Sequence, residues 1–455
     1  MPIRDILVSL IVAALAIAAL KRPYFGALLW VWLGLMNPHR LGWGFAYSMP
    51  FAQMAVAVTF LGIALNRNVV RWPSGGAVVV MLCFFAWMLV TSLAAFNVEV
   101  SLERYVAFFK VVLMTVVVGS LLRDRDQVVG LIWAIALSIG YFGVKGGIFT
   151  IATAGSYRVW GPTDSAISGN NELAVALIMT VPLMYFLAQE TAVAARWPVF
   201  RRLGEKWIRR GLYAAMFLTA IAAIGSQSRG ALLSILAMSG VMWWRSKSKL
   251  PLAVAGVVFA GIVLLAAPES WFDRMNTIRT YDQDASALGR LNAWTMAINI
   301  ANDRISGAGF AMASRLVYEL YAPDPSLVLV AHSIYFQVLG EHGYIGLALF
   351  LLMWMITYRM AGSIVKISRR DSELSWALNF ANMAKVSMVG FAVGGAFLDL
   401  AYWDMPYYLM VALTATRLIV DERFAGRYNA QEGATRYDRK MSTMNAVTAD
   451  RRREA

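Results

Sequence analysis

The stretch VAHSIYFQVLGEHGYIGLALF, residues 330–350, leads a short polar segment directly into a long apolar run. The run covers residues 333–358, which exceeds the ~20 residues that a helix needs to cross the hydrocarbon core of a bilayer. At its entrance stands His332, one of only three histidines among 455 residues. The stretch therefore predicts a transmembrane helix with a titratable side chain at its mouth.

Comparable apolar runs recur along the whole chain. Hydrophobic residues make up 59% of it and charged residues 15%, a composition that indicates a polytopic membrane protein rather than a soluble domain. The candidate spans lie near residues 5–20, 24–36, 50–66, 77–96, 101–122, 127–151, 172–189, 211–225, 231–244, 250–267, 333–358, 376–398 and 403–420. Because the second run is short and could pair with the first as a hairpin, we expect an all-α bundle of about 12 transmembrane helices, roughly 12 or 13.

Lys and Arg cluster in three of the connections between these runs. The clusters are Arg196, Arg201, Arg202, Lys206, Arg209 and Arg210; then Arg245, Lys247 and Lys249; then Arg359, Lys366, Arg369 and Arg370. Cytoplasmic loops carry an excess of such residues, so these connections face the cytoplasm. The segments 153–171, 226–230, 269–331 and 399–406 then face the other side, which in a bacterium is the periplasm. Topology also accounts for the net charge of +14 without a nucleic-acid partner.

The segment 269–331 is the long extramembrane stretch of this topology. Within it, LGRLNAWTMAINIAND at 288–303 spaces Leu291, Trp294, Ile298 and Ile300 like an amphipathic helix that could lie on the membrane surface. A second apolar face follows at Val317, Leu320 and Tyr321. We expect a transmembrane domain over residues 1–420 that includes this periplasmic loop. Residues 421–455 lose all apolar periodicity, which predicts a flexible cytoplasmic tail.

Three outward-facing elements each contribute a cation or a base. The turn SQSRG at 226–230 carries Arg229 between two spans, Arg290 follows Gly289 at the expected start of a helix, and His332 precedes the next span. A helix N-terminus and a guanidinium together suit a phosphate, and arginine binds phosphate bidentately. Histidine titrates near neutral pH and can accept a proton from a hydroxyl. These are the parts needed to displace a lipid diphosphate.

Each of these residues also has a simpler interpretation. Arg229 could anchor its span at the membrane edge, Arg290 could be a solvated loop residue, and His332 could cap or flank a helix. Periodicity alone does not decide between the interpretations. Lys145, near the outer end of its span, and Arg158 just beyond it are candidates to line a path for a lipid headgroup.

Other polar residues point to structure rather than to chemistry. His39 and His342 are expected to be structural, and the three histidines show no metal-ligand spacing. GNNELAVAL at 169–177 predicts a helix start capped by Asn170 or Asn171, in which Glu172 complements the helix dipole or orients an arginine. The D-x-D formed by Asp282 and Asp284 is a weak metal signal in an exposed loop, so we expect no metal and no cofactor.

The motifs taken together resemble a known family. The order SQSRGALL, GRLNAW and AHSIYFQVLGEHGYIG is similar to the O-antigen ligase and polymerase superfamily of bacterial inner-membrane proteins. LLWVWLGLMNPHRLGWGFAYSMPFAQ and YRVWGPTDSAISGNNELAVAL look more narrowly like the branch of O-glycosylation ligases found with exosortase systems. The resemblance covers nearly the whole chain to about residue 420.

The resemblance implies a GT-C-type glycosyltransferase bundle that takes a glycan from undecaprenyl diphosphate and joins it to an acceptor on the periplasmic side, without a required divalent metal. Carried over by motif, His332 matches the histidine proposed as base or transition-state organiser, and Arg229 and Arg290 match the arginines that engage the diphosphate. Many relatives have Asn after the histidine, whereas this chain has Ser333, which can still cap the helix.

The function expected on this basis is that of an inverting O-antigen ligase in the inner membrane. Its partners would be the lipid-linked donor, the lipid A core or a protein or exopolysaccharide acceptor, and membrane lipids. The alternatives are an O-antigen polymerase, a protein O-oligosaccharyltransferase using the same donor, and a flippase for lipid-linked glycans. A flippase would show charges spread through the membrane and internal repeats, whereas here the charges gather toward one face.

Overall fold

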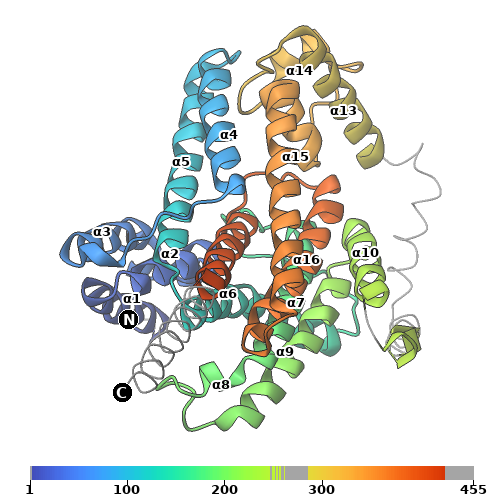
Figure 1. Ribbon diagram of the computed structural model, residues 1–455. Helices are drawn as coiled ribbons and strands as arrows, with labels where there is room; N and C mark the ends of the chain where they lie inside the picture. The colour runs from blue at the N-terminus through green and yellow to red at the C-terminus, as the bar shows by residue number, and fades with distance from the viewer. Residues whose placement is uncertain are drawn as a thin grey trace, which may run out of the picture.

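The computed structural model describes residues 3–245 and 285–425, with isolated positions from 248 to 261 between them (Figure 1). Regular structure in this part of the chain is helical, and eight of its segments are long and apolar enough to cross a membrane. They are α1 (Ile3–Lys21), α4 (Gly76–Leu93), α5 (Val98–Leu121), α6 (Arg125–Ala152), α7 (Asn170–Gln189), α9 (Gly204–Gly225), α15 (Ile334–Ser368) and Ser372–Phe397, which contains α16 (Ser375–Gly394). The expected all-helical, polytopic class is confirmed.

Shorter helices complete the bundle. Two apolar helices, α2 (Tyr24–Met36) and α3 (Phe51–Leu65), pack against each other and against α1. The helix α10 (Arg229–Arg245) packs on α16 and α7, the short α8 (Thr191–Ala194) precedes α9, and a last helix covers residues 404–425. The run expected at 250–267 lies largely outside the described residues, so the total of 12 or 13 spans stays a prediction. The same holds for the flexible tail, because residues 426–455 are outside them too.

Two of the long helices, α5 and α6, start at a side-chain cap. Asn97 accepts the backbone N–H of Val100 at 3.1 Å at the start of α5, and Asp124 accepts that of Gln127 at 2.8 Å at the start of α6. Such caps satisfy amide groups that have no partner inside the helix. Within the helices, intrahelical hydrogen bonds satisfy most backbone groups locally, as a lipid environment requires.

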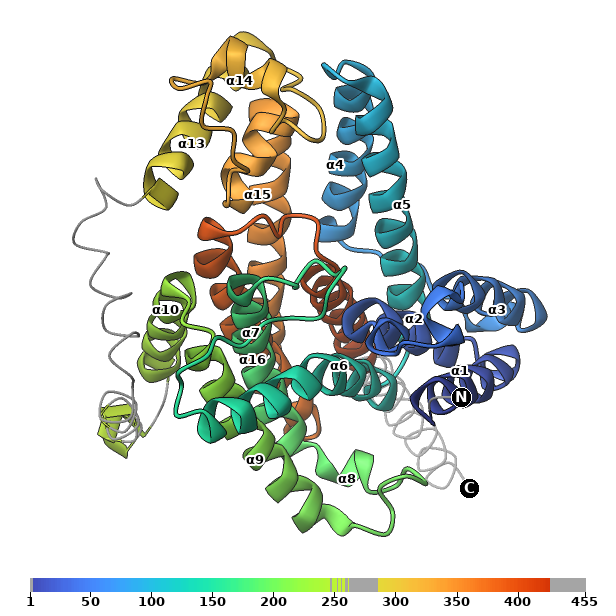
Figure 2. The ribbon, with the colours of Figure 1, turned by 180° about the vertical axis from the view of Figure 1, so that it is seen from behind.

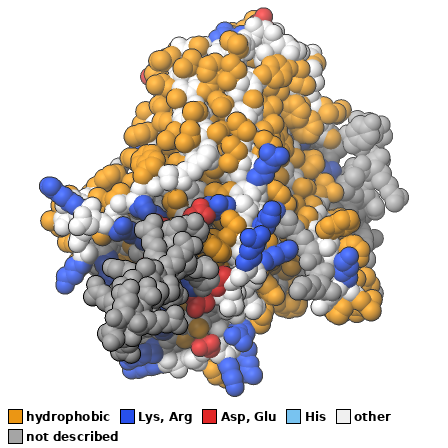
Figure 3. Space-filling view, in the orientation of Figure 1, with side chains coloured by type: hydrophobic (Ala, Val, Ile, Leu, Met, Phe, Trp, Pro, Cys, Tyr) orange, Lys and Arg blue, Asp and Glu red, His pale blue; other side chains and the backbone are white. Residues whose placement is uncertain are grey.

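The helices form two regions in the view of Figure 1, where α4, α5 and α15 rise above a lower group formed by α6, α7, α9 and α16. Hydrophobic side chains cover the upper part of this face, and Lys and Arg gather toward its lower part (Figure 3). From behind, the connection between α6 and α7 crosses the bundle as an irregular loop (Figure 2). The core is built mainly from α6, α7, α16 and residues 404–425, whose small and aliphatic side chains are buried.

Within α15, a sharp break occurs at Gly343, whose φ of 67° and ψ of −171° are not helical. The segment 285–331 docks on the backbone just before the break: Ala308 N–H donates to Gly340 O at 2.8 Å and Gly309 N–H to Glu341 O at 2.9 Å. A side chain at position 343 would meet the carbonyl of Ile305, because its Cβ would lie 2.2 Å from that oxygen. Glycine is therefore required for the segment 285–331 to dock on α15.

The segment 285–331 contains the two helices that the sequence predicts, α13 (Ala285–Asp303) and α14 (Arg315–Tyr321). The face of α13 that packs differs in part from the expected one, of which Trp294 and Ile300 do pack. Its buried residues are Ala293, Met296, Ala297 and Ile300, which face α14 and α15, whereas Leu291 and Ile298 are exposed. The small side chains of Ala293 and Ala297 permit close approach to α15. A search of the sequence for large apolar residues does not identify these two positions.

Candidate functional site

The first element of the site is the buried turn between α9 and α10. Ser226, Gln227 and Ser228 are at most 6% exposed, and Gln227 adopts a left-handed φ of 55°. Asn170 holds this turn by donating its side-chain amide to the carbonyl of Ser226 at 2.8 Å. The prediction that Asn170 or Asn171 caps α7 is wrong, because Gly169 takes the cap position and Asn170 is the first helical residue.

Arg229 is the first residue of α10 and follows this turn. The start of α10 lies against the short helix η6 (Gly395–Phe397), since a Cβ added at Gly230 would come within 3.4 Å of the Cβ of Phe397. Phe397 stands two residues before Asp399 in the chain. The packing of α10 thus brings the backbone at Arg229 next to the loop that carries Asp399.

The second element is His332, which takes a left-handed φ of 45° just before α15. Its Nδ1 lies 3.3 Å from Oδ2 of Asp399, and the side chains are 33% and 24% exposed. The backbone N–H groups of His332 and Ser333 both bond to the same carboxylate. Successive N–H groups in such a conformation form a concavity for an anion. The left-handed backbone is thus what directs two N–H groups and the imidazole toward one acid.

The side chain of Ser333 does not perform the expected capping role. Ser333 occupies the N-cap position of α15, but its hydroxyl makes no capping bond and is buried without a hydrogen-bond partner among the described residues. The backbone N–H of Ser333 bonds to Asp399 instead. The helix start is therefore stabilised by Asp399 rather than by the residue that opens it.

The third element is Arg290, which lies in the second turn of α13. The expectation that it stands at a helix N-terminus is wrong, because α13 begins five residues earlier at Ala285. The helix is fixed to the chain before His332: the indole of Trp294 donates to the carbonyl of Ala331 at 2.7 Å, and the amide of Asn292 to that of Asp324 at 2.8 Å. The guanidinium of Arg290 therefore belongs to a helix that these hydrogen bonds fix to the chain before His332.

Arg290 acts electrostatically on three groups from separate parts of the fold. They are Glu172 at the start of α7, His332 and Asp399. The sequence interpretation that Glu172 orients an arginine fits this arrangement. Arg290 and His332 are thus brought together from segments on either side of α14, and Asp399 joins them from beyond α16.

Burial sets the protonation of the histidine and the acid. It lowers the pKa of His332 below the ordinary 6.5, and the charge of Arg290 lowers it further. Burial raises the pKa of Asp399 to about 6, against the backbone N–H groups and Arg290, which lower it. At neutral pH the imidazole is neutral and the carboxylate is mainly ionised. A proton on Nδ1 facing Asp399 leaves the lone pair of Nε2 available as a base.

Sequence reasoning missed Asp399 as a functional residue. It noted only that the segment 399–406 faces outward. An acid at the outer end of an apolar run is a usable signal, because such groups are costly near lipid and tend to be paired. Its partner, however, is set by the packing of α16 against α15 and not by any local pattern.

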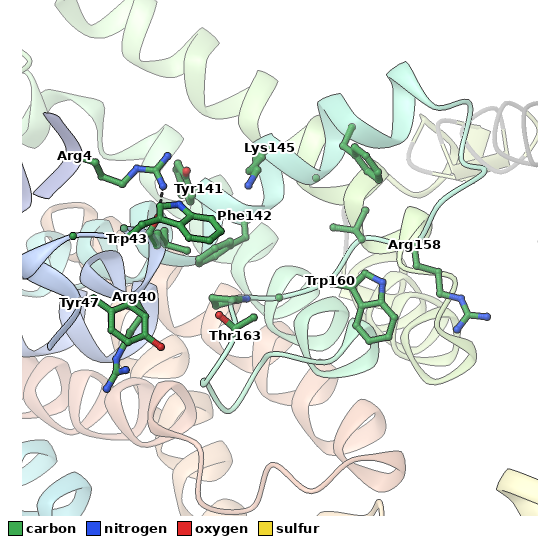
Figure 4. A pocket seen from close by; sticks show the side chains of 18 of the residues that line it. Arg4, Arg40, Trp43, Tyr47, Tyr141, Phe142, Lys145, Arg158, Trp160 and Thr163 are labelled. Atoms are coloured by element: carbon green, nitrogen blue, oxygen red, sulfur yellow. Dashed lines mark hydrogen bonds between the residues drawn. The ribbon is translucent and has the colours of Figure 1, made fainter. Parts of the chain in front are cut away.

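Lys145 and Arg158 lie in a different place from His332. Both line a cavity of about 980 Å³ formed by the N-terminal helices and the connection between α6 and α7 (Figure 4). Arg158 connects this cavity to the first element, because its Nε donates to Oε1 of Gln227 at 3.4 Å. Asp282 and Asp284 are outside the described residues.

The other two histidines have structural surroundings, as the sequence predicts. His342 is fully buried, its Nδ1 lies 2.7 Å from the hydroxyl of Thr91, and its ring packs edge-on against Phe310. His39 is in a short helix, η1 (Pro38–Leu41), and contacts the ring of Phe51 edge-on.

The fold and this cluster define a polytopic membrane protein that carries arginines and a neutral histidine at one end of its helices. Residues 214–351 match the O-antigen ligase family, and residues 3–192 match a family of unknown function. No curated protein matches the chain. The first match confirms the resemblance to the O-antigen ligase superfamily and places that domain over Arg229, Arg290 and His332. It supports ligase- or polymerase-type activity on a lipid-linked glycan; the narrower exosortase-associated branch stays a prediction.

Proposed function

We propose that the protein is an inverting glycosyltransferase of the O-antigen ligase type. It transfers a glycan from undecaprenyl diphosphate to a hydroxyl of the lipid A core at the periplasmic face of the inner membrane. One observation carries the proposal: Nδ1 of His332 contacts the carboxylate of Asp399, and the imidazole lies within the electrostatic influence of a cation, Arg290. A neutral imidazole beside an arginine combines a base for the acceptor with a charge for the leaving group.

In the proposed reaction the acceptor oxygen attacks the anomeric carbon of the donor sugar. A bond forms between these two atoms while the bond from that carbon to the diphosphate oxygen breaks, and the diphosphate leaves with the electron pair. Nε2 of His332 takes the proton of the attacking hydroxyl, and Asp399 stabilises the resulting imidazolium through Nδ1. A single displacement inverts the anomeric configuration.

The arginines act on the leaving group. Negative charge develops on the diphosphate as the bond breaks, and a guanidinium already oriented toward it stabilises the transition state more than the ground state. Arg290 supplies this charge beside His332, and Arg229 supplies it from the start of α10. A bound diphosphate also offsets the charge of Arg290, which makes His332 a stronger base once the donor is in place.

The test is transfer by the purified protein reconstituted with a lipid-linked glycan. Lipid A core, a second lipid-linked unit and a protein acceptor are offered in parallel, with and without chelator. His332→Asn is the informative variant, because asparagine tolerates the left-handed backbone at this position better than alanine. Arg290→Gln is paired with Arg315→Gln, a change at an exposed arginine of the neighbouring α14.

We expect transfer to lipid A core, a loss of about 10²- to 10⁴-fold in His332→Asn, and near wild-type rates in Arg315→Gln. Transfer to the second lipid-linked unit or to the protein alone would replace the ligase assignment by one of the alternatives. Normal transfer by both His332→Asn and Arg290→Gln would reject the site. Inhibition by chelator would reject the metal-free mechanism.

A further inference from the structure

The cavity that holds Lys145 and Arg158 is built entirely from the segment that matches the family of unknown function. Its volume of about 980 Å³ lies at the upper end of the ~300–1,000 Å³ usual for small-molecule sites. The wall consists of α6, the loop from Leu41 to Ser48, and residues 158–163 of the α6–α7 connection. Such a space accommodates several sugar rings or a phosphorylated headgroup.

Lys145 is the lining residue whose positive charge favours an anionic ligand. It lies on the face of α6 that also carries Tyr141 and Phe149, one turn before and one turn after it, and all three line the cavity. The described residues provide no hydrogen bond or ion pair for its amine. A charge within an apolar helix is costly unless it meets water or an anion. In the view of Figure 4, the ring of Trp43 lies between Arg4 and Lys145.

The other three lining cations contact neutral groups, which do not balance their positive charge. Arg4 donates to the carbonyl of Leu41, Arg40 stacks 4.5 Å above the ring of Tyr47, and Arg158 bonds to the neutral amide of Gln227. Among the described residues, four cations and no acid therefore line the cavity.

Two acids lie close to this wall. Asp164, beside the lining residue Thr163, accepts the hydroxyl of Tyr47 at 3.2 Å. Asp5 is buried beneath the loop, where its Oδ1 lies 3.3 Å from the backbone N of Ala46. Neither forms an ion pair with a lining cation among the described residues, and the four lining cations outnumber these two acids.

Two exposed tryptophans add a second chemical feature. Trp43 is 95% exposed and Trp160 is 61% exposed, and both line the cavity. Tryptophan is common at membrane interfaces, but there the ring usually rests against lipid rather than around a cationic cavity. An amphipathic ring beside cations suits a ligand with both an apolar sugar face and a negative charge.

We infer that this cavity binds the anionic, sugar-bearing headgroup of a membrane glycolipid, with Lys145 and Arg4 at the charge and Trp43 and Trp160 at the sugar rings. The inference rests on the proposed function and makes this ligand the acceptor. The diphosphate donor is assigned to Arg229 and Arg290, and the Arg158–Gln227 contact places the cavity beside the same turn. Donor and acceptor would thus approach the α9–α10 turn from opposite sides.

The experiment measures binding directly, on the full-length protein in nanodiscs of neutral phospholipid. The probes are phosphorylated lipid A core, the same glycolipid after removal of its phosphates, and phosphatidylglycerol. The variants are Lys145→Gln and Arg4→Gln, with Lys110→Gln as the control, because Lys110 is another exposed lysine of an apolar helix, α5. Trp160→Ala is paired with Trp72→Ala, which removes a tryptophan of similar exposure outside the cavity.

We expect phosphorylated lipid A core to bind at least about 10-fold more weakly to Lys145→Gln and Arg4→Gln, the effect of losing one charge-assisted contact, and unchanged to Lys110→Gln. Removing the phosphates should cost a similar factor, and Trp160→Ala should weaken glycolipid binding more than Trp72→Ala. Equal binding by Lys145→Gln and the wild type would overturn the proposal. Equally tight binding of phosphatidylglycerol would overturn its sugar-specific part.

The outcomes separate the cavity from the catalytic site. His332→Asn should bind lipid A core like the wild type while failing to transfer glycan. If His332→Asn fails to transfer and Lys145→Gln binds normally, the cavity assignment is wrong and the proposed function stands. If Lys145→Gln loses binding while His332→Asn transfers normally, the cavity stands and the catalytic assignment is wrong.

Discussion

Asp399 holds His332 from two directions: its Oδ2 lies 3.3 Å from the imidazole Nδ1, and its carboxylate also accepts the backbone N–H groups of His332 and Ser333. One acid therefore sets the backbone conformation, the ring orientation and the tautomer of the proposed base. This relationship makes Asp399 a positioning residue whose loss should affect chemistry more than donor binding.

Asp399→Asn should lower kcat by roughly 100-fold, a part of the 10²- to 10⁴-fold that a general base contributes. The amide can present an N–H to Nδ1, which reverses the tautomer and removes the lone pair at Nε2. Initial rates at varied donor concentration test this, with the KM for donor expected to change little. Asp421→Asn, at an exposed acid paired with Arg417, is the control. A large rise in KM with unchanged kcat would contradict the positioning role.

The pH dependence of transfer should have an acid limb set by His332. The base works only when neutral, so activity is lost as the pH falls through its pKa, which lies below 6.5. Protonation of Asp399, with a pKa of about 6, removes the partner of the ring in the same range. Profiles of kcat/KM from about pH 4.5 to 8 cover the pKa values of both groups. They measure how activity falls on the acid side. A midpoint well above 6.5 would contradict the environment of His332.

Arg290→Gln should raise the pKa of His332, because it removes a positive charge that disfavours the imidazolium. Burial remains, so the pKa should stay below that of an exposed histidine. NMR titration of histidine-labelled protein can follow it, and the presence of only three histidines makes assignment by substitution practical. Arg315→Gln should leave the titration unchanged. An unchanged pKa of His332 in Arg290→Gln would show that the two groups are not neighbours.

Gly343→Ala should destabilise the docking of the segment 285–331 on α15. The left-handed φ with extended ψ at this position costs other residues about 1–3 kcal/mol, and a Cβ would meet the carbonyl of Ile305. Thermal unfolding in detergent measures the effect. Gly240→Ala in α10 is the control, because no atom lies within 4 Å of its added Cβ and alanine favours a helix. Equal melting temperatures for Gly343→Ala and the wild type would contradict this role of the break.

Transmembrane class and helix positions were accessible from the sequence because both follow from local properties. Apolar runs of sufficient length predict the spans, and the excess of Lys and Arg in alternate connections predicts their orientation. The helices α13 and α14 were predicted from apolar spacing in the same way. The sequence also singled out Arg229, Arg290 and His332 as outward residues with suitable chemistry, and the family match covers all three.

Only the tertiary structure decided which distant groups meet. Asp399 becomes the partner of His332 because α16 packs against α15, and Asn170 holds the turn before Arg229 instead of capping its own helix. The face of α13 that packs is chosen by the close approach of its alanines to α15, and the cationic cavity arises where α6 meets the N-terminal loop. Sequence periodicity describes one helix at a time, whereas these contacts depend on the angles and depths at which separate helices pack, which no local pattern encodes.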